Sequence, residues 1–260
     1  MTRDSAIQTT KVFILSAEHR DLPDGCQITF HGRSAEHGYV KVEVTGWRPY
    51  FFVERSRENG LPAGALRQPS ALRTFTQQEL DCLVFKHQRD LLAARRWFNS
   101  RGVKTFEADI SPPERFLMDR LIHASAAVSG VPVLVPGGAL YRNPELTPAE
   151  AGLDPVIASV DIETAMSGGG LFSIGVHLTA GESDEKVVWM LGDRSGTSLQ
   201  PWGELHYCST EAEAMTLFMR WLAERDPDIL VGWNVQNFDL AFLEKHVPPG
   251  GIALHLRQER

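Results

Sequence analysis

The sequence contains no apolar run long enough to span a bilayer. Its first ten residues are polar and lack the apolar segment that a signal peptide needs. Cysteine is scarce, because Cys26, Cys82 and Cys208 are the only three and lie far apart. Three such cysteines predict neither a disulfide framework nor a metal cluster. These absences argue against a membrane-spanning or disulfide-rich protein and indicate a reducing cytoplasm.

A strongly basic composition, which is common in proteins that bind nucleic acid, is also missing. The formal net charge is -7 over 260 residues. Residues 151–260 hold 16 acidic and 7 basic residues, whereas residues 1–150 hold 17 and 19. Prolines 144, 148 and 155 interrupt regular structure between these parts. We therefore expect two domains, 1–150 and 151–260. An acidic domain can still process nucleic acid if metal ions offset its charge.

The first 150 residues predict a small, mixed, β-rich domain. Strand patterns within residues 11–54 predict a curved antiparallel sheet, and a strand–helix–strand pattern follows over residues 82–107. Ser111 and Pro112 are suited to start a helix that continues to about residue 123. Two segments lack a clear pattern: we expect mostly loop over residues 55–80, and two short strands with a connection over residues 125–147.

The second part begins with a short apolar strand, residues 156–164, that carries an acidic pair near its end. Strand side chains alternate between faces, so Asp161 and Glu163 share one face and Ile162 points to the core. Two neighbouring carboxylates repel each other unless a proton or cation separates them. A hard divalent cation such as Mg²⁺ or Mn²⁺ suits these oxygen ligands. Taken alone, such a pair is more often an exposed strand end with solvated acids.

The later elements favour a metal-binding role for this acidic pair. Two further strands complete an antiparallel meander, and a capping box at Thr210 and Glu213 starts an amphipathic helix. A buried strand over residues 229–233 and a helix ending near His246 follow. This β-β-β-α-β-α order is that of a ribonuclease H-like core. If the fourth strand lies parallel to the first, Asp239 approaches Asp161 and Glu163, and three carboxylates then converge as in a metal-dependent phosphodiesterase.

Two segments carry a resemblance to a known family. Asp161-Ile162-Glu163 resembles the first exonuclease motif, Asp-x-Glu, of family B DNA polymerases, and Asn234 to Asp239 resembles the second, Asn-x-x-x-Phe-Asp. Residues 106–120 resemble the segment that leads into this exonuclease. The chain is therefore similar to the N-terminal portion of a bacterial family B polymerase. The resemblance implies an α/β (α+β) protein with a β-rich N-terminal domain and an incomplete ribonuclease H-like exonuclease domain.

The resemblance also implies roles for individual residues. Asp161, Glu163 and Asp239 would bind two catalytic Mg²⁺ or Mn²⁺ ions, while Asn234 and Phe238 would position the nucleotides at a 3′ end. The implied reaction is 3′→5′ proofreading of single-stranded DNA ends. The implied partners are primer-template DNA, the C-terminal polymerase domains and a sliding clamp. The expected setting is DNA replication and repair in the cytoplasm, without a membrane.

One part of the family pattern is absent from the sequence. The third exonuclease motif, Tyr-x-x-x-Asp, should follow Asp239, but all four tyrosines precede it, and each has Glu four residues later. We therefore expect a piece of a longer protein with little or no exonuclease activity of its own. Two alternatives remain: a stand-alone nuclease that uses Glu244 as a further acid, or a non-catalytic module that binds single strands.

Overall fold

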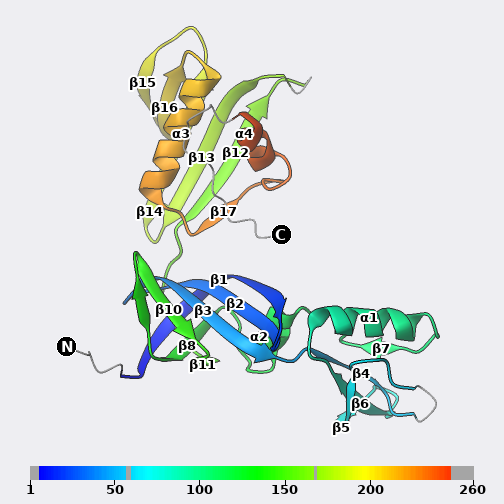
Figure 1. The fold of residues 1–260 in the computed structure, drawn as a ribbon. Coiled ribbons are helices and arrows are strands. Elements are labelled where there is room, and N and C mark those ends of the chain that lie inside the picture. Colours follow the sequence, from blue (N-terminus) through cyan, green and yellow to red (C-terminus); the bar gives the residue numbers. More distant parts are fainter. Residues whose placement is uncertain (1–5, 57–59, 167–168, 247–260) are drawn as a thin grey trace. The chain divides into compact units, whose positions relative to one another are not determined.

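The computed structural model describes residues 6–56, 60–166 and 169–246. Backbone contacts divide the chain into two compact units, Met1–Leu153 and Asp154–Arg260, and each unit is considered separately. Both units combine strands with helices, which confirms the predicted α/β class (Figure 1). In the part of the chain that is described, no helix has the length and apolarity needed to cross a bilayer.

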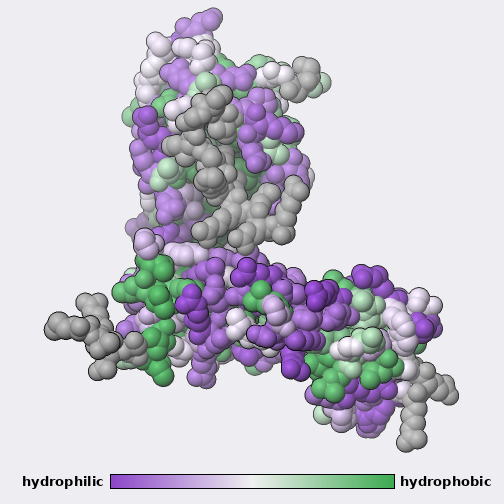
Figure 2. Space-filling view, in the orientation of Figure 1, coloured by the Kyte–Doolittle hydropathy of each residue, from purple (hydrophilic) through white to green (hydrophobic). Residues whose placement is uncertain are grey.

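The first unit contains a seven-stranded sheet of order β11-β8-β1-β2-β3-β10-β9. Its strands are β1 (Gln8–Leu22), β2 (Gly25–Ser34), β3 (Gly38–Trp47), β8 (Ser125–Gly130), β9 (Val133–Val135), β10 (Gly138–Arg142) and β11 (Glu145–Pro148). The β1-β2-β3 meander agrees with the predicted antiparallel sheet. The region 125–147 was expected to form two strands, but it contributes to four. The β9–β10 hairpin exposes apolar side chains (Figure 2). Leu134 is the most exposed of them, at 65%.

A second, four-stranded sheet of order β5-β6-β4-β7 belongs to the same unit. Its elements are β4 (Tyr50–Glu54), β5 (Leu66–Arg73), β6 (Glu79–Val84), α1 (Gln88–Asn99) and β7 (Thr105–Phe106). Since β6 and β7 are both antiparallel to β4, they are parallel to each other, and α1 is the crossover of the predicted strand–helix–strand unit. The prediction of loop over residues 55–80 was wrong for β5. The prediction that residues 50–53 join the first sheet was also wrong.

Helix α2 (Pro112–Met118) begins where the sequence predicts and ends earlier. Ser111 is its N-cap, and the backbone N–H and hydroxyl of Ser111 both donate to Glu114 Oε2, at 3.1 and 2.8 Å. The helix stops at Met118, about one turn before the expected end. Leu121 follows with φ of 56°, a left-handed conformation that an α-helix does not accommodate.

In its described residues, the second unit is a six-stranded sheet of order β15-β16-β14-β13-β12-β17 with two helices (Figure 1). Its elements are β12 (Ile157–Thr164), β13 (Leu171–Ala180), β14 (Ser183–Leu191), β15 (Gly196–Gln200), β16 (Gly203–Cys208), α3 (Glu211–Arg225), β17 (Ile229–Val231) and α4 (Asp239–His246). The antiparallel meander β12-β13-β14 and the parallel pairing of β12 with β17 agree with the sequence prediction. Strands β12 and β17, the first and fourth strands of the predicted core, therefore lie side by side.

The core of this unit lies between the sheet and its helices. Buried side chains of α3, among them Phe218 and Trp221, pack with Trp189 of β14, and Leu243 of α4 joins the same cluster. Strand β17 differs from the prediction of a buried strand. It lies at the edge of the sheet, and its last residue, Val231, is 41% exposed.

Candidate functional site

The predicted acidic pair lies on β12, as the alternation of its side chains requires. Asp161 and Glu163 are both exposed, whereas Ile162 between them is buried in the core. The register with β13 continues through this segment, with Asp161 opposite Gly175 and Glu163 opposite Ser173. The two carboxylates therefore project from one face of a paired strand, just before the register shifts between Glu163 and Thr164.

The third predicted acid, Asp239, is the first residue of α4 and is almost completely buried. Its Oδ1 accepts a hydrogen bond from the backbone N–H of Ile162 at 3.0 Å. Its Oδ2 is buried and has no hydrogen-bond partner within the described residues. Burial raises the pKa of Asp239, the hydrogen bond from Ile162 lowers it, and the charge of Asp161 raises it again. Asp239 thus contacts the peptide between the acidic pair.

The path of the chain between β17 and α4 explains this position. The pairing of Ser159 with Val231 brings the end of β17 beside β12. Gly232 comes next and packs so closely that a Cβ on it would lie 2.4 Å from the carbonyl oxygen of Val160. A side chain at this position would push the strands apart. Glycine therefore allows the chain to pass directly beside the residue that precedes Asp161.

Asn234 and Phe238 lie in the turn that follows. Asn234 has φ of 57°, a left-handed conformation that asparagine tolerates better than most residues. Its carbonyl oxygen accepts hydrogen bonds from the N–H groups of Asn237 and Phe238, at 3.1 and 3.0 Å. The Asn234 side chain is exposed, and Phe238 is 46% exposed. Both side chains are therefore accessible on the loop that leads to Asp239.

The donor set of the site fits a divalent cation only in part. Two exposed carboxylates and one unpartnered buried carboxylate oxygen are the hard oxygen ligands that such a cation prefers. In the described part of the chain, no three His, Cys, Asp or Glu side chains form a group with the spacing of a metal site. The residues therefore suit a metal by their chemistry, whereas their arrangement among the described residues does not form a three-ligand metal site.

Two anchoring residues of this unit were not singled out by the sequence. Asp228, just before β17, accepts a hydrogen bond from the N–H of Val156 through Oδ2 at 2.8 Å and donates its own N–H to the Val156 carbonyl at 2.8 Å. Glu211 of α3 accepts from the N–H of Leu171 through Oε1 at 3.1 Å. Asp228 belongs to the Asp-Pro-Asp segment that follows α3, and nothing in the sequence indicates that it also bonds to the backbone of Val156.

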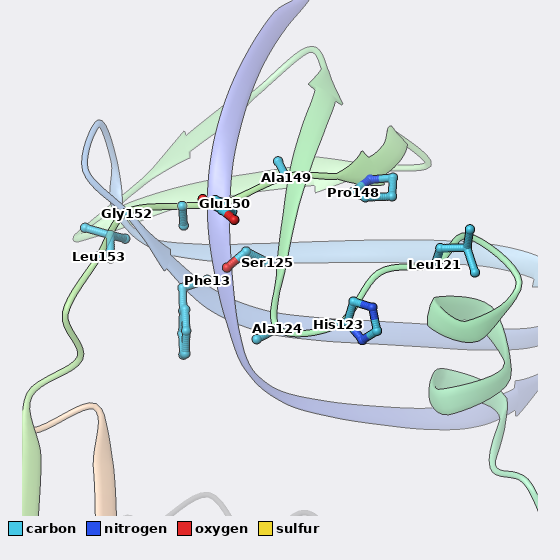
Figure 3. A pocket seen from close by; sticks show the side chains of 11 residues that line it. Phe13, Leu121, His123, Ala124, Ser125, Pro148, Ala149, Glu150, Gly152 and Leu153 are labelled. Atoms are coloured by element: carbon cyan, nitrogen blue, oxygen red, sulfur yellow. The ribbon is translucent and has the colours of Figure 1, made fainter.

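The first unit contains a separate pocket of about 520 Å³ (Figure 3). Apolar groups form most of its wall, with Phe13, Ala124 and Leu153 among them, and His123 and Glu150 supply the titratable groups. None of the predicted site residues lines it. This pocket is therefore unrelated to the acidic site of the second unit.

Comparison with known proteins matches the part of the second unit that carries Asp239, and the match begins after Asp161 and Glu163. Residues 180–248 match the family model described as the exonuclease domain of DNA polymerase family B. The matched segment includes Asn234, Phe238 and Asp239. The chain therefore contains a segment of a DNA polymerase family B exonuclease domain.

Two similar proteins are DNA polymerases. The chain is 30% identical over 254 residues to DNA polymerase II of Escherichia coli, an alignment that covers 95% of this chain and 31% of that protein. It is 29% identical over 183 residues to a DNA polymerase of Thermococcus hydrothermalis, covering 68% of this chain and 9% of that protein. The chain thus spans less than a third of the length of either relative.

A solved structure has the same fold. The family B DNA polymerase from the archaeon Pyrobaculum calidifontis matches 90% of this chain and 32% of its own chain with a TM-score of 0.63. Sequence identity in this comparison is 18%, so it supports the fold alone.

Proposed function

We propose that the chain carries part of the 3′→5′ proofreading exonuclease site of a DNA-directed DNA polymerase. Residues 1–150 form the N-terminal domain of that enzyme, and residues 151–260 belong to its exonuclease domain. The observation that supports this best is the contact of the Asp239 carboxylate with the Ile162 amide, between Asp161 and Glu163. This contact joins the two sequence motifs in one site.

The proposed reaction is hydrolysis of the last phosphodiester bond of a single-stranded DNA 3′ end. Asp161, Glu163 and Asp239 would hold the metal, Mg²⁺ or Mn²⁺. When bound, the metal would activate the attacking water and offset the charge on the leaving oxygen. Asn234 and Phe238 hold the terminal nucleotides. The buried Asp239 keeps its carboxylate fixed through the Ile162 hydrogen bond.

The wider setting follows from the family. The substrates are single-stranded 3′ ends and primer-template DNA, and the partners are the C-terminal polymerase domains and a sliding clamp. The place of action is the cytoplasm, in DNA replication and repair. Each of these belongs to the whole polymerase, of which this chain matches only part.

Shortening of a 5′-labelled single-stranded oligonucleotide tests the proposed reaction. In the protein as its gene encodes it, Asp161→Asn and Asp239→Asn should each lower the rate by at least about 100-fold, because each removes a negatively charged metal ligand. EDTA should abolish the reaction, and Mg²⁺ or Mn²⁺ should restore it. Glu244→Gln is the matched control, since Glu244 is an exposed acid on the same helix.

Cleavage that persists in EDTA or in Asp161→Asn would contradict the proposal. Binding of single strands without any metal-dependent cleavage would instead support a non-catalytic binding module.

A further inference from the structure

Trp233 is exceptional among the six tryptophans of the chain. Its side chain is 94% exposed, and the next most exposed, Trp202, reaches 45%. Trp189 and Trp221 of the same unit are buried in the core. An indole left in water forgoes the burial of a large apolar surface, and exposed aromatic side chains of this kind commonly serve in binding.

The backbone on both sides of Trp233 is held in place. On one side, Gly232 packs against the carbonyl oxygen of Val160, the residue before Asp161. On the other side, Asn234 adopts φ of 57° and accepts two backbone hydrogen bonds from the turn that follows. Trp233 is therefore anchored beside the acidic site on a defined turn.

The charge of this unit limits how it can attract a nucleic acid. Residues 151–260 hold 16 acidic and 7 basic residues, so phosphates gain no net attraction from them. Binding of a single strand then depends on contacts with the bases. An aromatic face provides such contacts for any base, because every base has a π surface.

We propose that Trp233 stacks on an unpaired base of the single-stranded 3′ end and positions that strand at the acidic site. The proposal rests on the proposed exonuclease function and adds a positioning residue to it. Phe238, 46% exposed, lies at the other end of the same turn. In the chain, Trp233 directly precedes the exposed Asn234, and Phe238 follows it four residues later.

Binding of a short oligothymidylate in EDTA tests the proposal without cleavage. In the protein as its gene encodes it, Trp233→Ala should weaken binding by about tenfold, the loss expected for one stacked base. Trp233→Phe should restore most of the affinity, because it keeps an aromatic face. The quenching of tryptophan fluorescence by the oligonucleotide should nevertheless decrease in Trp233→Phe, since the quenched indole is gone.

Two controls make the test specific. Trp202→Ala, a change of the other exposed tryptophan of this unit, should leave affinity unchanged. An oligonucleotide that lacks bases at its last 3′ positions should bind the original protein and Trp233→Ala equally. Unchanged affinity in Trp233→Ala, or an equal loss on the strand without bases, would overturn the proposal.

The proposed exonuclease function can fail separately. Asp161→Asn should remove cleavage while leaving the Trp233-dependent binding in place. If the protein never cleaves but binds through Trp233, the stacking role stands and only the exonuclease function is lost.

Discussion

At the scale of single residues, the acidic site and its surroundings involve residues that bear no carboxylate. Asp161 and Glu163 share one face of β12, and Asp239 contacts the Ile162 amide between them, as strand alternation and a parallel crossover predict. Gly232 and Trp233 are different. Within an apolar run such as Ile-Leu-Val-Gly-Trp, the sequence does not distinguish a glycine in close backbone contact from one in open space, nor a buried tryptophan from an exposed one.

Gly232→Ala tests the importance of the close approach between β17 and β12. A Cβ on Gly232 would lie 2.4 Å from Val160 O and 3.0 Å from Val235 Cβ, so the backbone must shift. We expect a loss of about 1–3 kcal/mol in the free energy of unfolding, measured by urea denaturation. Gly192→Ala is the control, because no atom lies within 4 Å of its added Cβ. Similar losses in both variants would refute this explanation.

At the scale of elements, an ion pair fixes α3 on β14. Glu185 Oε2 accepts from Arg225 Nε at 2.7 Å, and Glu185 Oε1 accepts from Trp221 Nε1 at 2.9 Å. The hydrogen bonds from Arg225 are the main reason why the pKa of Glu185 is lowered. Since its folded pKa is depressed, this carboxylate stabilises the fold above the ordinary pKa of 4.5 and loses that effect as the pH falls through the folded value.

Glu185→Gln should therefore destabilise the protein at neutral pH and have less effect in acid. We expect a loss of about 1 kcal/mol at pH 7, a modest value because the pair is partly exposed. Denaturation at several pH values should show the difference from the original protein shrinking below pH 4.5. Glu182→Gln, a change of an exposed acid in the adjoining turn, should show no such trend. A pH-independent loss in Glu185→Gln would contradict the charge-based explanation.

Other elements show why sequence patterns miss parts of this fold. Strands β5 and β15 lie at sheet edges, where one side is free of pairing and apolar alternation is weak. Pro69 within β5 is compatible with an edge and reads as loop in the sequence. Strand β17 shows the reverse error, because its apolar run predicts burial on both sides, while its edge position leaves it half covered. Whether such a segment forms a strand, and how far that strand is buried, depends on the strands it pairs with. The sequence does not specify those pairing partners.

At the scale of the first unit, its two sheets are joined through the start of α1. His87, the N-cap of α1, makes no side-chain cap hydrogen bond. Asp21, at the end of β1, supplies the cap instead: its Oδ1 accepts from Gln88 N at 2.8 Å and its Oδ2 from Arg89 N at 3.1 Å. A carboxylate from the seven-stranded sheet thus satisfies the free N–H groups of a helix that belongs to the four-stranded sheet.

Asp21→Ala should loosen this connection by about 1 kcal/mol, the usual effect of losing an N-cap. The amides of Gln88 and Arg89 should then exchange hydrogen faster, which hydrogen–deuterium exchange measures directly. Asp24→Ala is the matched control, since Asp24 is an exposed acid in the turn after β1. Exchange at these amides in Asp21→Asn should be intermediate between that in the original protein and that in Asp21→Ala, because the asparagine side chain keeps one acceptor oxygen and loses the charge. Unchanged exchange at Gln88 and Arg89 in Asp21→Ala would show that α1 is held by its packing on Phe51 and Leu83 rather than by this cap.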